Sequence, residues 1–185
     1  MKSWQEALAA GWAEAGGPRL MTLATIDRQG RPAARMVVVR EFERDTLTLT
    51  TDCRAEKWSQ VGRTSNATGV VWLADQRMQF RLRGLGRHVG DEDTRRRIWA
   101  GLTDASRAMF HWPMPGEAFV SDGAEGRFAR AVGQDSPLPE VFGVISLDVD
   151  EADVLDLRPH PHVRMTWRRE AASTTAPWVG RRVNP

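Results

Sequence analysis

The sequence predicts a mainly β protein, built as an antiparallel sheet or barrel with a few peripheral helices. Short runs of alternating or β-branched apolar residues recur along the chain, which is typical of strands. A turn-forming sequence, Asp27-Arg28-Gln29-Gly30, joins the first two runs directly, so these strands must be antiparallel. The expected strands are Leu20–Ile26, a strand from Arg31 through Val39, Thr46–Thr51, 67–73, Gln76–Leu85, Val141–Val149 continued by Val154–Leu157, Val163–Arg168 and Trp178–Val179.

Bulk properties limit the class of protein. The chain has 185 residues, a length typical of a single domain over 1–185, and a formal net charge of +2. The basic run at 95–97 follows acidic residues at 91–93, so no nucleic-acid-binding stripe is expected. No apolar run of membrane-spanning length occurs, and the single cysteine, Cys53, suits a reducing compartment. We expect a soluble, cytoplasmic protein with no membrane partner and no metal.

Three segments favour helix or loop. Trp4, Leu8 and Trp12 form one apolar stripe, so the N-terminal segment (1–17) is expected to be helical until Gly16-Gly17-Pro18. Asp91–Leu102 has acids in its first turn, and a second helix capped by Thr103 or Asp104 should end near Trp112. Residues 117–139 have no periodic pattern and form an irregular loop, a lid or a dimer arm.

The junction near residue 52 carries the strongest chemical signal. A strand ending in Thr50 and Thr51 leads through Asp52, a candidate N-cap, into a short helix with Arg54 and Lys57 in its first turns. Free backbone N–H groups and cationic side chains at a helix start form a phosphate site. Only two of the 26 basic residues are lysine, so Lys57 stands out, although an ordinary surface lysine explains it too.

These residues also carry a family resemblance. Arg35, Val37 and Arg40, followed by Thr50-Thr51 and Lys57, resemble the FMN-binding core of the pyridoxamine 5'-phosphate oxidase family. The resemblance continues to the C-terminus, where Trp178, Arg182 and Pro185 match a family pattern, so it spans Leu20 to Pro185. The Trp-Pro-x-Pro-Gly sequence at 112–116 looks like an uncharacterised bacterial subgroup of FMN-binding relatives.

The resemblance implies a split β-barrel that forms a homodimer, with FMN at the subunit interface. Arg35 and Lys57 should bind the phosphate. Glu56 stands where the family has an arginine, and Arg54 is expected to take over that role. The other residues that the resemblance assigns to the cofactor are Met36, Val37, Val38, Thr50 and Thr51, together with Gln79 and Arg164, of which one or both come from the partner. The parity of the strand places Arg35 and Arg40 on opposite faces, so a β-bulge or strand end is expected between them.

The vitamin B6 site of the family matches poorly. Its phosphate-binding lysine, tyrosine, arginine and serine correspond to Arg40, Trp99, Thr103 and Arg107 here. The family's Arg-x-His over the pyridine ring becomes His160-x-His162. The candidate substrate-binding residues are therefore Arg40, Trp99, Arg107 and His162, and we expect weak or absent oxidation of pyridoxamine 5'-phosphate.

Two functions of different class remain open at this point. The first is an FMN-dependent oxidase or reductase of a small substrate, anionic or neutral, with no assignable general acid or base. The second is a flavin-binding protein without turnover that serves storage or sensing. A haem- or deazaflavin-binding split barrel is a third reading.

Overall fold

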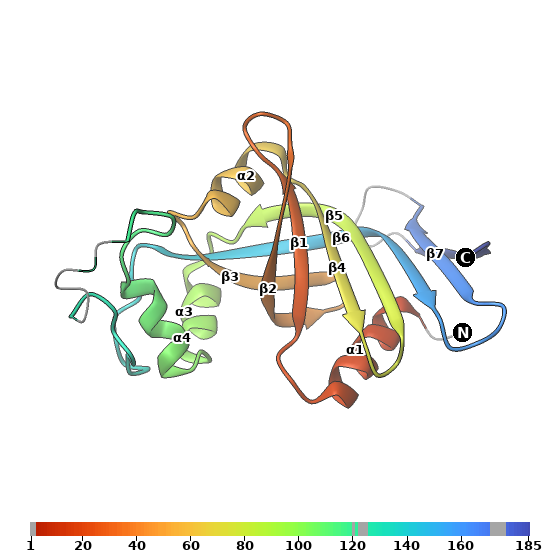
Figure 1. The fold of residues 1–185 in the computed structure, drawn as a ribbon, viewed down its shortest axis with the longest axis horizontal. Coiled ribbons are helices and arrows are strands. Elements are labelled where there is room, and N and C mark those ends of the chain that lie inside the picture. The colour runs from red at the N-terminus through yellow and green to blue at the C-terminus, as the bar shows by residue number, and fades with distance from the viewer. Residues whose placement is uncertain (1–2, 120, 122–125, 171–176) are drawn as a thin grey trace.

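The computed structural model describes residues 3–119, 121, 126–170 and 177–185 (Figure 1). The strands are β1 (Leu20–Ile26), β2 (Pro32–Glu43), β3 (Thr46–Asp52), β4 (Asn66–Leu73), β5 (Met78–His88), β6 (Phe142–Asp156), β7 (Val163–Arg169) and β8 (Trp178–Val183). The helices are α1 (Trp4–Ala15), α2 (Glu56–Thr64), α3 (Glu92–Ala100), α4 (Asp104–Ala108) and the 3₁₀ turn η1 (Met109–His111).

Antiparallel pairing closes six strands into a barrel. The sheet runs in the order β3-β2-β1-β4-β5-β6-β7-β8, and β3 pairs a second time, with β6. The long strand β6 serves two purposes, because Phe142–Asp148 pairs with β3 whereas Glu151–Asp156 pairs with β7. Strands β7 and β8 therefore extend beyond the closed barrel, on the side opposite α3 and α4 (Figure 1). The predicted fold class, a mainly β antiparallel split barrel, is confirmed.

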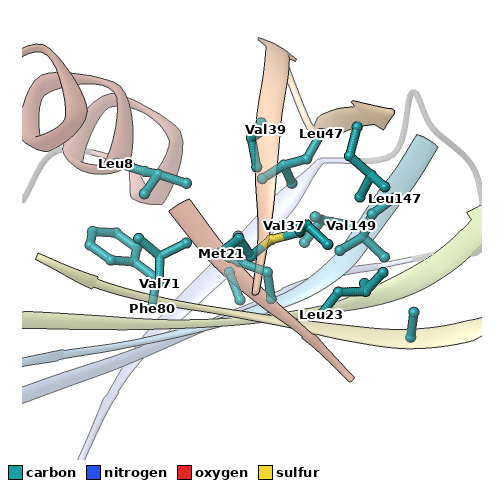
Figure 2. Close-up of a cluster of buried hydrophobic side chains, with 14 of the residues drawn as sticks. Leu8, Met21, Leu23, Val37, Val39, Leu47, Val71, Phe80, Leu147 and Val149 are labelled. Carbon is teal, nitrogen blue, oxygen red and sulfur yellow. The ribbon is translucent and has the colours of Figure 1, made fainter. Parts of the chain in front are cut away.

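The barrel interior is filled by the apolar residues that alternate along its strands. Met21 and Leu23 from β1, with Phe80 and Leu82 from β5, are almost fully buried and belong to one apolar cluster, part of which Figure 2 shows. Burial of one such side chain contributes about 1.5–3 kcal/mol relative to its exposed state. Other members of this cluster are Leu8, Val37, Val39, Leu47, Leu49, Val71, Leu147 and Val149.

A second, smaller core lies beneath α3, α4 and η1. Trp99 and Phe110 pack edge-on against Phe142 at the start of β6, with ring centroids 5.0 and 4.9 Å away. The helical segment after β5 is therefore fixed to the end of the barrel where β6 begins.

The N-terminal helix agrees closely with its predicted pattern. Ser3 caps α1 and forms a capping box with Glu6, and Gly16 ends the helix in the left-handed conformation at φ 64°. Trp4, Leu8 and Trp12 are buried. The apolar stripe is thus a core contact.

Several element boundaries differ from the sequence predictions. Strand β2 runs through Arg40 to Glu43, and the turn shrinks to Arg44 and Asp45 because β3 pairs with this extension. The segments 141–149 and 154–157 form one strand, because β5 and β7 hold the intervening residues. Arg77 lies in the β4–β5 turn with φ 48°, so β5 begins two residues later than predicted and continues to His88. Strand β8 continues to Val183.

The start of α2 also differs. Its N-cap is Ala55, whereas Asp52 remains the last residue of β3 and accepts a hydrogen bond from the backbone N–H of Arg54. The predicted β-bulge between Arg35 and Arg40 is confirmed, because the β2–β3 register shifts between Val39 and Glu41. Among the described residues, no helix is long and apolar enough to cross a membrane.

Candidate functional site

A cavity of about 600 Å³ lies where β2, β3 and the start of α2 meet the segment that follows α4. Its sheet-side wall contains Leu20, Met36, Val37, Val38, Arg40, Thr50, Thr51, Asp52, Ala55 and Lys57. Its opposite wall contains Met109, Phe110, residues 112–115, 117–119, Arg127 and Phe128. Seven of the sequence-predicted cofactor and substrate residues therefore gather at one cavity: Met36, Val37, Val38, Arg40, Thr50, Thr51 and Lys57.

The start of α2 is the cationic end of this cavity. Its N-cap residue, Ala55, has no side chain that could accept a hydrogen bond, so the first amide groups of the helix receive no side-chain cap. Within the described residues, the half-buried Lys57 ammonium forms no hydrogen bond or ion pair. Burial, and after it the charge of Arg35, lowers the pKa of Lys57. Two neighbouring cations at an uncapped helix start are stabilised by a bound anion.

Arg35 is held firmly beside this cationic end. Its guanidinium donates hydrogen bonds to the Thr25 hydroxyl (2.6 Å), the Gln60 side-chain oxygen (2.7 Å) and the Leu23 carbonyl (3.2 Å). Burial lowers the pKa of Arg35. These contacts join β2 to β1 and α2, so the charge is positioned before any ligand arrives.

Arg40 lines the cavity beside the β-bulge of β2. Its Nε donates a hydrogen bond to the Thr50 hydroxyl at 3.4 Å, a long contact. Burial lowers the pKa of Arg40. Arg40 shares the strand parity of Met36 and Val38, which also line the cavity, and it adds a further cation to the site.

The opposite wall is aromatic, and the sequence reading did not predict it. Phe128 packs against Trp112 and Phe119, with ring centroids 5.6 and 6.2 Å apart. The Trp112 indole N–H donates to the Ala129 carbonyl at 2.8 Å. The Trp-Pro-x-Pro-Gly sequence was the available signal, because its prolines prevent this segment from continuing the preceding helix.

Arg54 has a different place from the one expected. Its guanidinium forms a bidentate pair with Asp52 and also donates to the Trp112 carbonyl at 3.0 Å. Its charge is thus paired within the β3–α2 connection, and Arg54 does not line the cavity. Arg54 thereby links the aromatic wall to β3, because it contacts both Asp52 and the Trp112 carbonyl. The nearby Asp52 carboxylate binds the guanidinium that was expected to bind the FMN phosphate.

Arg107 and Trp99 do not line the cavity either. The Arg107 guanidinium is buried and donates to the carbonyls of Trp99, Ala100, Leu102 and Val132, and it pairs with Asp104. The Trp99 indole N–H donates to the Ser136 carbonyl at 3.2 Å. Both side chains support the second core and the 130s segment, which corrects their expected role as substrate ligands.

Gln79 is near the start of β5, whereas His162 and Arg164 are at the start of β7, a strand that lies on the side of the barrel opposite α3 and α4 (Figure 1). Gln79 is on β5 opposite Leu155, and Arg164 on β7 forms a bidentate pair with Asp153. His162 is exposed in the β6–β7 turn, where its Nδ1 lies 3.0 Å from the Pro159 carbonyl oxygen. A single chain does not bring these three residues to the cavity.

Comparison with known proteins identifies the family. The model of the pyridoxamine 5'-phosphate oxidase FMN-binding domain matches residues 1–90. A pyridoxine/pyridoxamine 5'-phosphate oxidase from Deinococcus deserti is 30% identical over 182 residues, with 92% of this chain and 82% of the relative covered. The chain belongs to the pyridoxamine 5'-phosphate oxidase family. Its cofactor is FMN, as the family's domain is FMN-binding.

Solved structures agree with this assignment. A pyridoxamine 5'-phosphate oxidase-related, FMN-binding protein from Nostoc punctiforme PCC 73102 superposes with a TM-score of 0.86 at 28% identity, covering 100% of this chain and 99% of the other. PhzG from Burkholderia lata 383, in complex with tetrahydrophenazine-1-carboxylic acid, superposes with a TM-score of 0.81, covering 97% of this chain and 90% of the other. At 17% identity, PhzG shows the fold alone.

The residues present fit FMN. Its dianionic phosphate matches the uncapped start of α2 and the two cations, Lys57 and Arg35. These two positive charges repel each other, and a bound phosphate would offset that repulsion. The rest of the cavity combines Thr50 and Thr51 with apolar and aromatic walls, which suits a ring system with a polar edge.

Proposed function

We propose that this chain is an FMN-dependent oxidoreductase of a small molecule, active as a homodimer. The supporting observation is the continuity of the site. The cationic end at Lys57 opens into the same cavity of about 600 Å³ that Arg40 and the aromatic wall line, so one space offers a phosphate anchor and room beside it. When bound, FMN supplies the hydride chemistry.

The side chains of the protein have separate tasks in this proposal. Lys57 and Arg35 bind the phosphate, and Thr50 and Thr51 hold the cofactor by their hydroxyls. Arg40 orients a substrate that carries a negative or electron-rich group, because among the described residues its guanidinium has a single, long hydrogen bond. The aromatic wall of Trp112, Phe119 and Phe128 excludes water and offers flat apolar surface to a planar substrate.

Two observations support a homodimer: exposed apolar surface, and the distance from the cavity of two residues that are predicted to bind FMN, Gln79 and Arg164. Leu20, Met36 and Trp72 are 45%, 60% and 52% exposed on neighbouring strands β1, β2 and β4, although large apolar side chains favour burial. Gln79 and Arg164 would reach FMN from the partner. Residues 117–139 have no α-helix or strand in their described part, which suits an arm across the interface.

The name of the Deinococcus relative suggests pyridoxine or pyridoxamine 5'-phosphate as substrate. Three of the four residues that correspond to the family's substrate-phosphate site make intramolecular contacts here. Trp99 and Arg107 are bound to backbone carbonyls, and Thr103 caps α4. We therefore favour a different small substrate.

The test uses FMN-loaded protein. The visible spectrum is recorded under anaerobic conditions while NADH or NADPH is added, and air is then admitted. We expect bleaching of the flavin bands by one nicotinamide nucleotide and their return in air, with hydrogen peroxide formed. Tight FMN binding without bleaching by either donor, and without turnover of a panel of planar amines and alcohols, would favour flavin storage or sensing and overturn the proposal.

A further inference from the structure

A second cavity, of about 290 Å³, lies between α1 and the strands β6 and β7. It shares no lining residue with the first cavity. In the ribbon view, α1 and α2 lie at opposite ends of the barrel (Figure 1). The lining residues are Ala7, Ala10, Gly11, Glu14, Gln76, Met78, Val154, Asp156, Arg158, Val163, Met165 and Trp167.

Gln76 makes this cavity unusual. It lies in the β4–β5 turn and is only 7% exposed. Within the part of the chain that the structure describes, neither its side-chain nitrogen nor its side-chain oxygen has a hydrogen-bond partner. Buried polar groups are nearly always paired, so an orphaned amide that lines a cavity indicates a missing partner.

The local packing leaves the Gln76 amide little alternative. The side chain lies against Gly11 of α1, where a Cβ atom would come within 3.8 Å of Oε1 and 2.1 Å of the Leu73 Cδ1 atom. Glycine at this helical position therefore lets α1 approach the turn closely. The amide therefore lies close to the helix, and it also lines the cavity, from which a polar partner could approach.

Two of the three charged residues at this cavity are paired with each other. Asp156 accepts hydrogen bonds from the Arg158 guanidinium at 2.9 and 2.8 Å, and Arg158 also contacts the Met78 sulfur at 3.4 Å. The third, Glu14 of α1, is exposed, and apart from Gln76 the other walls are apolar or small side chains. An anion would have to break the Asp156–Arg158 pair or lie near Glu14 without a free counter-charge, which is costly. A neutral occupant can satisfy the Gln76 amide without these costs.

We propose that this cavity binds a small neutral heteroaromatic molecule with a carboxamide or lactam edge. Such an edge offers one acceptor and one donor side by side, so it satisfies both the N–H and the oxygen of Gln76 at once. Its flat apolar body fits against Met78, Met165 and Trp167. The site is separate from the flavin cavity and does not depend on the proposed oxidoreductase function.

The test measures binding of nicotinamide to FMN-loaded protein by ligand-observed NMR and by calorimetry. Nicotinamide is a neutral ring with a primary carboxamide, and FMN occupies the first cavity during the titration. We expect binding with a dissociation constant on the order of 1 mM or tighter. Nicotinate, which has the same ring with a carboxylate, should bind at least about tenfold more weakly because the cavity offers it no free cation.

Two variants locate the site. Gln76→Leu removes the amide, and Ala10→Phe fills the cavity from α1; each should weaken nicotinamide binding at least tenfold while FMN affinity is unchanged. Ala9→Phe is the matched control, because Ala9 is an exposed neighbour on the same helix and does not line the cavity. Equal nicotinamide affinity in Gln76→Leu, or a crystal soaked in nicotinamide that shows only ordered water at Gln76, would overturn the proposal.

Discussion

Arg35 and Lys57 are electrostatic neighbours that come from different elements, β2 and α2, and meet at the start of α2. Burial, followed by the charge of Arg35, lowers the pKa of the Lys57 ammonium. In the part of the chain that the structure describes, Arg35 donates hydrogen bonds to Thr25, Gln60 and the Leu23 carbonyl, whereas Lys57 donates none. The two cations therefore differ in kind: Arg35 is fixed by the fold, whereas Lys57 is left for the ligand.

The first prediction concerns Lys57→Ala. Loss of one charge-assisted contact should weaken FMN binding by about 10–100-fold. Thermal stability of the FMN-free protein should not fall, because the wild-type ammonium is a half-buried cation beside another cation. Quenching of flavin fluorescence on titration with protein measures the affinity.

The control for Lys57→Ala is Arg63→Ala, which removes a cation from the last turn of the same helix, remote from the cavity lining. FMN affinity should stay near the wild-type value in this control. A large drop in melting temperature for Lys57→Ala, with unchanged FMN affinity of the folded protein, would make Lys57 structural.

The second prediction concerns alkaline pH. A bound phosphate favours the charged ammonium, so FMN affinity should decrease as pH rises through the lowered pKa of Lys57, below its ordinary value of 10.5. Lys57→Arg stays charged in this range and should keep its affinity. Comparison of the two proteins cancels any titration of the flavin itself. Parallel pH profiles would show that Lys57 does not bind the phosphate.

The stability of the FMN-free protein should respond with the opposite sign. Because the folded pKa of Lys57 lies below the unfolded value, the unfolded chain binds more protons between the two pKa values. The contribution of Lys57 to the free energy of unfolding therefore rises with pH across that window. Urea unfolding of wild type and Lys57→Met at a series of pH values isolates this contribution.

The third prediction tests the structural assignment of Arg107. Arg107→Ala leaves buried carbonyls without a donor, so the free energy of unfolding should fall by about 3 kcal/mol, or about 6–12 °C in melting temperature. FMN affinity of the folded variant should change less than about threefold. Arg96→Ala on α3 removes only an exposed pair with Glu92 and should be nearly neutral. A stable Arg107→Ala variant with impaired substrate turnover would restore Arg107 to the substrate site.

The fourth prediction concerns vitamin B6. FMN-saturated protein in air should form little or no pyridoxal 5'-phosphate from pyridoxamine or pyridoxine 5'-phosphate, because Trp99, Thr103 and Arg107 are committed to internal contacts. The Deinococcus deserti oxidase serves as the positive control under the same conditions. Turnover comparable to that control, at micromolar substrate, would show that Arg40 and other residues rebuild the phosphate site.

The fifth prediction concerns the shared site. If Arg164 reaches FMN from the partner, Arg164→Ala should weaken FMN binding at least about tenfold. Arg168→Ala is the matched control, because Arg168 makes a similar surface pair with Glu151 two positions further along the same face of β7. Sedimentation velocity with flavin detection should place FMN in a dimer.

Mixing Lys57→Ala with Arg164→Ala provides the decisive form of this experiment. A mixed dimer contains one site with both residues intact, so mixing should restore tight FMN binding to a fraction of the sites. Homodimers of either variant cannot do so. No recovery after demonstrated subunit exchange, or tight FMN binding by a monomer, would contradict the shared site.

Much of the fold was predictable because it depends on local sequence. Alternating apolar residues in Leu20–Ile26, the Asp27–Gly30 turn and the stripe of Trp4, Leu8 and Trp12 specify strand, hairpin and helix over short distances. An irregularity in β2 near Arg40 was also predicted, since two arginines five residues apart lie on opposite faces of a regular strand, and the register shifts between Val39 and Glu41. The cofactor came from a motif whose residues are close in sequence or paired in one hairpin, Arg35 to Lys57.

The sequence by itself thus determined the core of most strands, FMN as the cofactor, and three of the residues that line the cavity, Met36, Thr50 and Lys57. Only the tertiary structure decided that β3 closes the barrel against β6, and that Arg107 is used by carbonyls and Arg54 by Asp52. The sequence shows that an arginine is present but does not specify whether its guanidinium binds a ligand or a backbone carbonyl. Its role depends on which acceptors the folded chain brings within about 3 Å, and contacts such as that between Arg107 and Val132 arise only when distant segments pack together.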